Sequence, residues 1–354
     1  MEQEEDTRSQ TRKSNAIKDF LAQNNVRVFH DLCVLRAKGW ESDEAERHFT
    51  KQRVTADSSA SNKKTQHAFF KRMLEIAEEI NHATEIFPQQ AGQRVLDVCM
   101  APGAFTEFAL RRNPRCIVDG ITLPPESGGH ELLVRTSGRR NLTISFTDLT
   151  LHTIYLPPGM SVPEHFPDHH AFTTNPPLPQ LSPPYDLVIC DGQRLRTHEQ
   201  AELRSWEPGR LLLSQLILAL TNIKPGGTML VLLHRVEQWN TVSLLYRFSQ
   251  FADINLFKPK SAHATRSSFY LIATGVRPDS AAPWVSHLRH CWARMTFGGE
   301  EGRGAPLDGA EDLEVDDVLR VFGGRLISLG HVIWETQRDA LSASKWIRGS
   351  GSGS

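Results

Sequence analysis

The residues best placed to do chemistry lie in one short segment, residues 95–108, which reads V-L-D-V-C-M-A-P-G-A-F-T-E-F. Val95, Leu96 and Val98 are typical of a strand buried on both faces, and the apolar residues that follow Gly103 recur at helical spacing. A glycine at such a junction lets a ligand approach the backbone, and the first amides of the helix attract a carboxylate or phosphate. The segment therefore predicts a binding site for a nucleotide-like ligand.

The number of glycines limits the size of that ligand. The dinucleotide pattern G-x-G-x-x-G is absent, and Gly103 is the one glycine in this turn. A single glycine leaves little room for a pyrophosphate, so a smaller ligand with one carboxylate, such as S-adenosylmethionine, fits the turn better.

Two motifs carry a resemblance to a known family. D-V-C-M-A-P-G-A-F-T-E at residues 97–107 resembles the first motif of the FtsJ (RrmJ) family of RNA ribose methyltransferases, and D-L-V-I-C-D-G at residues 186–192 resembles the segment with its catalytic aspartate. Other segments agree in order and spacing, at residues 120–124, 146–148, 224–231 and 257–270. The resemblance covers roughly residues 65 to 276. It implies a Rossmann-like α/β fold, a mostly parallel seven-stranded sheet with helices on both faces, and S-adenosylmethionine as cofactor.

The resemblance also assigns the cofactor site. Asp97 would lie beside the methionine and ribose, Asp148 would accept a hydrogen bond from the adenine amino group, and Thr122 stands where many family members carry an acidic residue. The full expected set is Asp97, Ala101, Pro102, Gly103, Phe105, Thr122, Asp148 and Asp191. An alternative is that Asp97 and Asp148 only form turns or caps, but their placement after successive strands favours a ligand.

The family's catalytic Lys-Asp-Lys-Glu set is half present. Lys71 matches the first lysine and Asp191 the aspartate, whereas Leu232 and Ser268 stand at the positions of the second lysine and the glutamate. A leucine cannot take a proton, and Asp191 without its cationic neighbours cannot lower a lysine pKa in the family's way. Because side chains alternate along a strand, His234 shares a face with Leu232, about 7 Å further along. His234 is therefore a candidate substitute base, the alternative being a strand-end histidine in solvent.

Three functions follow from these motifs. The leading one is methyl transfer to an RNA ribose 2'-hydroxyl. The second, favoured by the missing lysine and glutamate, is a catalytically inactive FtsJ-like pseudoenzyme that serves as a binding or scaffold subunit. The third is a methyltransferase that acts on a small molecule or a protein, which suits the net charge of -1.

The charge distribution gives mixed information about an RNA partner. A general RNA binder usually carries a clear basic excess, which this chain lacks. Three local clusters stand out: Arg135, Arg139 and Arg140; Arg194, Arg196, Arg204 and Arg210; and Lys258, Lys260 and Arg266. The last two clusters follow strand ends, where open α/β sheets bind ligands, although scattered arginines also simply solvate a surface.

The chain divides into a helical N-terminal extension and linker (1–64), the FtsJ-like domain (65–276) and a C-terminal helical extension (277–348). The stretch 151–184 is an insert so rich in proline that a regular helix cannot run through it, and its histidines lack the spacing of a metal site. We expect the extensions to cap the core, with a protein-binding surface as the alternative. Residues 349–354 alternate glycine and serine and resemble an appended linker.

Periodicity predicts helices over residues 14–50, 69–80, 209–223, 239–251 and 315–341, a polar linker over 51–66, and a closing hairpin between 254–257 and 269–273. No apolar run reaches membrane-spanning length, and the acidic start resembles neither a signal nor a transit peptide. The five cysteines are odd in number and show no C-x-x-C spacing. We therefore expect a soluble intracellular protein, in cytoplasm or nucleus, with free thiols and no metal.

Overall fold

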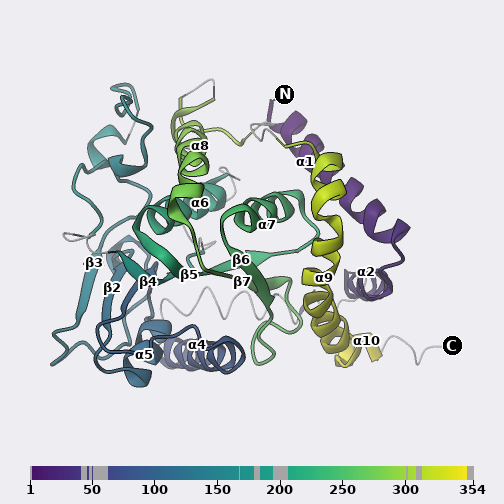
Figure 1. The fold of residues 1–354 in the computed structure, drawn as a ribbon, viewed down its shortest axis with the longest axis horizontal. Helices are drawn as coiled ribbons and strands as arrows, with labels where there is room; N and C mark the ends of the chain where they lie inside the picture. The colour runs from purple at the N-terminus through teal and green to yellow at the C-terminus, as the bar shows by residue number, and fades with distance from the viewer. Residues whose placement is uncertain are drawn as a thin grey trace.

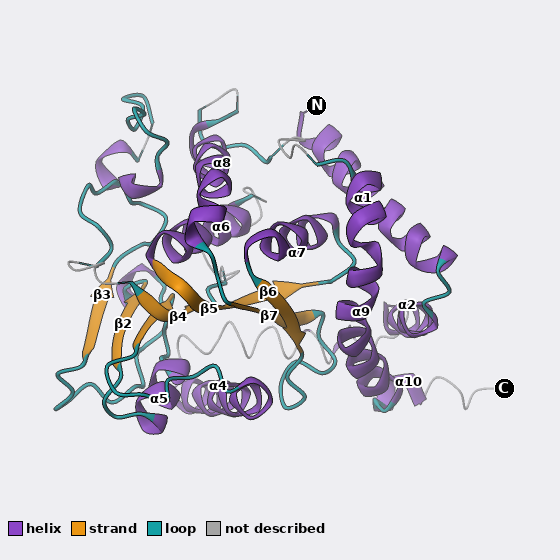
Figure 2. Cartoon of the chain, viewed as in Figure 1, coloured by secondary structure: helices purple, strands orange, loops and turns teal. Residues whose placement is uncertain are grey.

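The computed structural model describes residues 2–40, 46–47, 50, 63–166, 168–178, 184–193, 206–299, 302–307 and 313–348. These residues form a seven-stranded sheet in the order β3-β2-β1-β4-β5-β7-β6 (Figures 1 and 2). The strands are β1 (Arg94–Val98), β2 (Ile117–Thr122), β3 (Leu142–Phe146), β4 (Tyr185–Cys190), β5 (Ile223–His234), β6 (Asp253–Phe257) and β7 (Ser268–Thr274). The first five run parallel, and β7 is antiparallel to both β5 and β6. The expected Rossmann-like fold is confirmed.

Helices cover both faces of this sheet (Figure 1). On one face lie α4 (Lys63–Thr84) and α5 (Ala104–Arg112); on the other lie α6 (Glu207–Asn222), α7 (Trp239–Phe251) and α8 (Pro278–Phe297). Each face has its own apolar cluster, and Val95 belongs to one whereas its neighbour Leu96 belongs to the other. Because successive side chains of a strand point to opposite faces, β1 supplies apolar side chains to both, Val95 to one and Leu96 and Val98 to the other.

Apart from α8, the helices of the two terminal extensions form one helical unit beside the β6 edge of the sheet. This unit consists of α1 (Glu2–Gln23), α2 (Arg27–Trp40), α9 (Val315–Ser342) and the short α10 (Lys345–Arg348) (Figure 1). The rings of Phe29 in α2 and Trp334 in α9 lie 5.2 Å apart, and both side chains are buried. Helix α9 also contacts β6 and so covers an edge strand that would otherwise leave backbone groups unpaired. The extensions do cap the core, as expected.

The proline-rich insert is irregular but well packed. Its described residues form two short 3-10 turns, η3 (Thr153–Tyr155) and η4 (His169–Ala171), and no α-helix, as predicted. Tyr155 is fully buried, with its ring 5.4 Å from that of Trp292 in α8. Arg289 of the same helix donates hydrogen bonds to the carbonyls of Ile154 and Leu156. The C-terminal extension therefore anchors the insert, which the sequence had suggested was a surface feature.

Most element boundaries agree with the sequence periodicity. The predicted helix at 239–251 has the bounds of α7, and the closing hairpin is the β6–β7 pair. The linker prediction was wrong at residues 63–66, which form the first turn of α4, and the rest of that stretch, 51–62, lies outside the described residues. The first turn of α4 has no apolar residue, since Lys63 and Lys64 are exposed and the buried residue is Gln66, so apolar periodicity could not reveal it.

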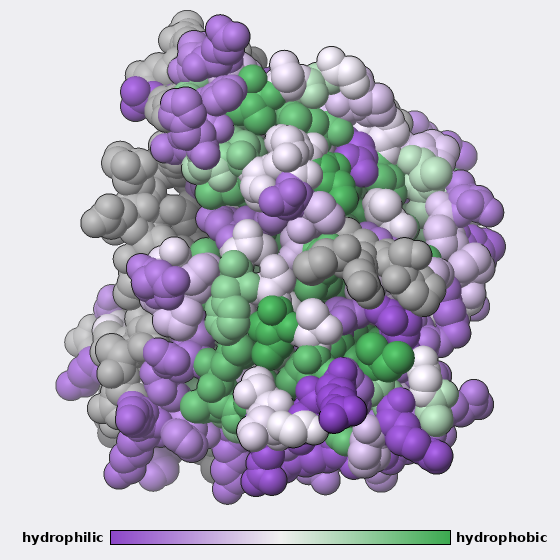
Figure 3. Space-filling view, turned by 90° about the vertical axis from the view of Figure 1, so that its left-hand side faces the viewer, coloured by the Kyte–Doolittle hydropathy of each residue, from purple (hydrophilic) through white to green (hydrophobic). Residues whose placement is uncertain are grey.

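The opposite edge of the sheet, β3, is less covered. Phe146 at its end is 53% exposed, and the side of the molecule nearest β3 mixes hydrophobic and hydrophilic surface (Figure 3). A short edge strand of this kind limits pairing with other chains. Among the helices that the structure describes, none combines the length and the apolar character needed to cross a membrane.

Candidate functional site

A cavity of about 980 Å³ opens at the carboxyl ends of β1 and β4. The chain leaves these neighbouring parallel strands toward opposite sides of the sheet, which creates a crevice where open α/β sheets bind ligands. The cavity is at the upper end of the size range of ligand pockets, about 300–1,000 Å³. Its wall includes seven of the eight expected cofactor residues: Asp97, Ala101, Pro102, Phe105, Thr122, Asp148 and Asp191.

The eighth, Gly103, shapes the turn from behind the wall. Its backbone φ of 92° is left-handed, its amide donates to the Met100 carbonyl at 2.6 Å, and it directly precedes α5. A Cβ at this position would lie 2.9 Å from Val134, so both conformation and space require glycine. The turn points the N-terminus of α5 at the cavity, as the sequence predicted.

Asp97 is a buried carboxyl at the end of β1, with 2% of its surface exposed. The hydroxyl of Thr106 in α5 donates to its Oδ2 at 2.6 Å. Desolvation nevertheless outweighs this bond and raises the Asp97 pKa to about 7. A positively charged ligand beside Asp97 would favour the ionised carboxylate.

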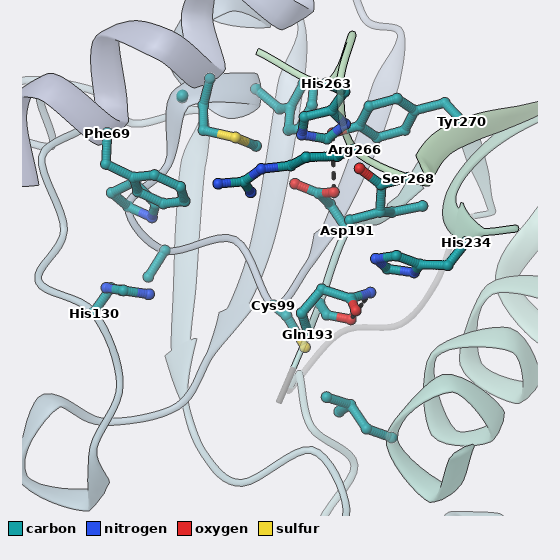
Figure 4. A pocket seen from close by; sticks show the side chains of 18 of the residues that line it. Phe69, Cys99, His130, Asp191, Gln193, His234, His263, Arg266, Ser268 and Tyr270 are labelled. Carbon is teal, nitrogen blue, oxygen red and sulfur yellow. Dashed lines mark hydrogen bonds between the residues drawn. The ribbon is translucent and has the colours of Figure 1, made fainter. Parts of the chain in front are cut away.

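Asp191 follows β4 and is the second carboxyl of this region. Tyr270 of β7 donates its hydroxyl to Oδ1 of Asp191 at 3.1 Å (Figure 4). Desolvation raises the Asp191 pKa to about 8; the Tyr270 bond opposes this rise and the nearby Asp97 adds to it. Two carboxyls with raised pKa values in one cavity fit a cofactor that carries positive charge.

Asp148 combines a turn with a ligand-facing position. Its Oδ1 accepts hydrogen bonds from the amide and the hydroxyl of Thr150, both at 2.8 Å, and Arg210 donates to that hydroxyl at 3.1 Å. The turn-forming role raised from the sequence is therefore real. Asp148 also lines the cavity, and no hydrogen bond from the described residues reaches its other oxygen, which stays available for a ligand.

The loop between β6 and β7 brings a histidine to Tyr270. The His263 ring stacks on the Tyr270 ring, with centroids 5.8 Å apart and planes 6° apart. Desolvation, together with the positive charges of Arg266, Lys258, His234 and Arg72, lowers the His263 pKa to about 3. This lowered pKa favours the neutral ring of His263 at physiological pH.

Lys258 holds this loop in place. Its ammonium donates to the carbonyls of Arg266 at 2.6 Å and Ser268 at 2.8 Å, and only 3% of the residue is exposed. Desolvation and the positive charge of Arg36 lower the Lys258 pKa to about 7, although Glu237 works against them. Of the three basic clusters noted in the sequence, this one reaches the cavity through Arg266, and the second reaches it through Arg210.

The predicted catalytic residues are only partly brought together. Leu232 and His234 both line the cavity, on the shared strand face that alternation predicts, and His234 lies directly opposite Ser268 across the β5–β7 pair. His234 is exposed, and desolvation and the positive charges of Lys258, Arg235 and Arg266 lower its pKa. Lys71 is an exposed residue of α4 and is not part of the cavity wall.

The wall facing Asp191 is aromatic. Phe69 of α4 stacks on His130 with centroids 5.6 Å apart, and the two rings lie across the pocket from Asp191 and Tyr270 (Figure 4). The side chain of Arg266 extends between these two walls (Figure 4). Among the described residues no cluster of histidine, cysteine, aspartate and glutamate could hold a metal ion.

Residues 66–276 match the sequence family described as FtsJ-like methyltransferase. The chain belongs to this family. S-adenosylmethionine is the cofactor of FtsJ-like methyltransferases, and the glycine turn with its two desolvated carboxyls fits that cationic ligand.

Two curated relatives of this FtsJ-like chain are cap-specific mRNA (nucleoside-2'-O-)-methyltransferases. The methyltransferase numbered 1 of Trypanosoma cruzi is 27% identical over 107 residues, which are 30% of this chain and 29% of the relative. The enzyme of Autographa californica nuclear polyhedrosis virus is 27% identical over 189 residues, 52% of this chain and 65% of the relative. The chain thus spans less than two thirds of either relative.

Solved structures with a similar fold include the N-methyltransferase NodS of Bradyrhizobium japonicum WM9 in complex with S-adenosylhomocysteine. That match has a TM-score of 0.36 and 13% identity and covers 61% of this chain and 94% of NodS. An rRNA methylase of Streptococcus thermophilus matches with a TM-score of 0.33 and 14% identity, covering 57% of this chain and 97% of that one.

Several cavity residues were not foreseen from the sequence. Tyr270 ends the segment 257–270 that resembles the family, and this resemblance was the signal that could have found it. Phe69 and His130 are 61 positions apart in the sequence, and only the fold brings them together. Residues of the terminal helices, such as Arg36 and Trp346, lie outside the family match and carried no signal.

Proposed function

We propose that this protein transfers a methyl group from S-adenosylmethionine to a ribose 2'-hydroxyl of RNA. The observation that carries the proposal is the position of Asp191, which borders the acidic cofactor residues on one side and the cationic loop with Arg266 on the other. A cationic donor and an anionic acceptor chain would thus approach Asp191 from opposite directions. The curated relatives, which are named for cap-specific mRNA 2'-O-methylation, support an RNA acceptor.

We assign the proton of the acceptor hydroxyl to Asp191. Leu232 replaces the family's basic lysine, and no lysine is among the described residues that line the cavity. The raised pKa of Asp191, about 8, is near the working pH, which suits a general base. Asp191 gains further affinity for a proton during the reaction, because the positive charge on the donor sulfur disappears as the methyl group leaves. Tyr270 orients the carboxylate throughout.

His234 is the alternative base. It lies at the cavity rim and is the residue expected from strand alternation, but neighbouring cations lower its pKa. Methyl transfer by the variants Asp191→Asn, His234→Ala and Lys71→Ala separates the candidates. We expect Asp191→Asn alone to abolish transfer. Loss in His234→Ala with activity retained in Asp191→Asn would assign the proton to the histidine instead.

The test of function is label transfer from methyl-labelled S-adenosylmethionine into total RNA, total protein and small-molecule fractions. Label in RNA that survives alkaline hydrolysis as a 2'-O-methylated dinucleotide supports the proposal. Label in protein or metabolites would establish a different methyl acceptor. Calorimetric titration of the wild type and Asp148→Ala with S-adenosylmethionine checks the cofactor site separately, and we expect the variant to lose binding.

A second function is favoured by one specific observation. The cavity wall carries Leu232 and Ser268 where the family's cation and glutamate are expected, so no ammonium group among the described wall residues keeps Asp191 ionised. A pseudoenzyme that binds cofactor and serves as a scaffold subunit would show binding in calorimetry and no label in any fraction. The helical unit at the chain termini would then be the surface for a protein partner. In either role we propose that the protein acts in the cytoplasm or nucleus.

A further inference from the structure

The cavity continues beyond Asp191 into the terminal helices. Its far wall includes Leu35 and Arg36 of α2, Leu341 of α9 and Trp346 of α10, all outside the family match at 66–276. Leu341 and Trp346 are mostly buried, at 5% and 9% exposed, and the part of each that lines the cavity is apolar or aromatic. The helical extensions therefore contribute a part of the cavity that the FtsJ-like domain alone does not contain.

Charge divides this cavity into two ends. The cofactor end carries the carboxyls of Asp97, Asp148 and Asp191 and the paired side chains of Glu207 and Arg210, whereas the far end carries the guanidinium groups of Arg235 and Arg266; the wall also includes the carboxyl of Glu46. Desolvation is the main cause that lowers the pKa values of His234 and His263, and the positive charges at the far end lower them further. The far end therefore suits an anionic ligand, and the cofactor end does not.

Arg235 is the best placed of these cations. It follows β5 directly, its side chain is exposed to the cavity, and it has no ion pair with any described residue. Its backbone φ of 47° is left-handed, which is unfavourable for an arginine, and its amide donates to the Ser267 carbonyl at 2.9 Å. The structure thus holds a strained residue with an unpaired cation at the rim, a combination found at ligand sites.

A polar network joins the helices that line the far end of the cavity to the β6–β7 loop. Arg36 donates to Glu237 at 2.7 Å and to Gln337 of α9 at 2.7 Å, and Gln337 in turn donates to the Thr265 carbonyl at 3.2 Å. Thr265 directly precedes Arg266 in the β6–β7 loop. The N-terminal and C-terminal extensions are therefore coupled through hydrogen bonds to the loop that carries a cavity cation.

We propose that this far end binds an RNA nucleotide beyond the immediate neighbour of the methylated one, out of reach of a dinucleotide, with its phosphate beside Arg235 and Arg266 and its base against Leu341 and Trp346. The inference rests on the proposed RNA acceptor. A phosphate matches the cations at the rim, and a planar aromatic base matches the apolar recess, since every base can stack on an aromatic side chain. The terminal helices then select acceptors long enough to reach them.

The experiment compares binding of a mixed-sequence RNA pentanucleotide and a dinucleotide at several salt concentrations, with S-adenosylhomocysteine present. The first variant is Arg235→Asn, which removes the cation but keeps a residue that accepts left-handed backbone. We expect pentanucleotide affinity to fall about tenfold, with the salt dependence reduced by about one counterion. Because asparagine relieves the backbone strain at position 235, the melting temperature of the Arg235→Asn variant should not fall. The matched control, Arg320→Asn, removes an exposed arginine of α9 that is outside the cavity wall.

The second variant, Trp346→Leu, tests the base. Loss of one stacking contact should weaken pentanucleotide binding about tenfold and leave the dinucleotide unaffected, which a mere loosening of α10 would not do. Equal losses for both lengths, or none, would overturn the subsite.

If wild type methylates RNA while both variants bind like wild type, only this inference fails. If wild type binds the pentanucleotide in a variant-sensitive way but transfers no methyl group, the subsite stands and the proposed catalysis fails. A wild type that binds neither RNA overturns both.

Discussion

The two carboxyls of the cofactor site make a sharp prediction about cofactor binding and pH. The Asp97 pKa is about 7 and the Asp191 pKa about 8, both raised mainly by desolvation. S-adenosylmethionine carries a sulfonium charge, which favours the ionised form of each carboxyl. Binding must therefore release protons from the protein, and affinity must rise with pH.

The size of the effect follows from these two values. At pH 7 about half of the Asp97 carboxyls and about nine tenths of the Asp191 carboxyls are protonated. Full ionisation on binding would therefore release about half a proton from Asp97 and about nine tenths of a proton from Asp191. If both must ionise fully, affinity rises on the order of a thousandfold between pH 6 and pH 9. S-adenosylhomocysteine has the same amino acid and nucleoside but no sulfonium charge, so its affinity should change much less.

Calorimetric titration in two buffers with different ionisation enthalpies counts the released protons directly. In wild type at pH 7 we expect more than one proton per S-adenosylmethionine, and in Asp191→Asn about nine tenths of a proton less. The Asp97→Asn variant should lose about half a proton. Equal affinity for S-adenosylmethionine at pH 6 and pH 9, with no proton released, would refute the assignment of these carboxyls to the sulfonium end of the ligand.

Three further predictions concern the residues around this site. Tyr270→Phe removes the donor to Asp191, so methyl transfer should fall roughly tenfold and its pH profile should move to higher pH; an unchanged profile would separate Tyr270 from Asp191. Lys258→Ala leaves the Arg266 and Ser268 carbonyls without their donor and should lower the free energy of unfolding in urea by about 1–3 kcal/mol; an unchanged midpoint would show that the loop is held otherwise. In the absence of ligand, wild-type stability should fall as pH rises from 4 through the raised Asp97 pKa of about 7, whereas Asp97→Asn should be more stable at pH 8 by roughly 2–4 kcal/mol in thermal unfolding; a smaller gap at pH 8 than at pH 5 would contradict this sign.

The sequence predicted the cofactor end of the cavity better than the acceptor end. Residues 95–108 form a local unit, in which an apolar strand, one glycine and an amphipathic helix fix the geometry without help from distant segments. His234 could be placed beside Leu232 because strand alternation is equally local. The residues expected at the cofactor could therefore be named one by one, and seven of the eight line the cavity.

The acceptor end depends on contacts between segments far apart in the chain. Arg36 meets Gln337 across 301 positions, and no periodicity in either helix reports the other. The exposed position of Lys71 also depends on the rotation of α4 about its own axis against the sheet. The apolar stripe of the helix sets this rotation only approximately. The pKa values of Asp97 and Asp191 likewise arise from burial, which a sequence does not display.

The pairing of α2 with α9 and α10 has a consequence for synthesis of the protein. Chain growth completes the cofactor end of the cavity once β7 has formed near residue 274, but the far wall awaits Trp346. A nascent chain still attached at its C-terminus, or a fragment limited to residues 66–276, would hold a cofactor turn with an open acceptor side. The acceptor selection that we propose would therefore become possible only after residue 346 has been made, later than cofactor binding.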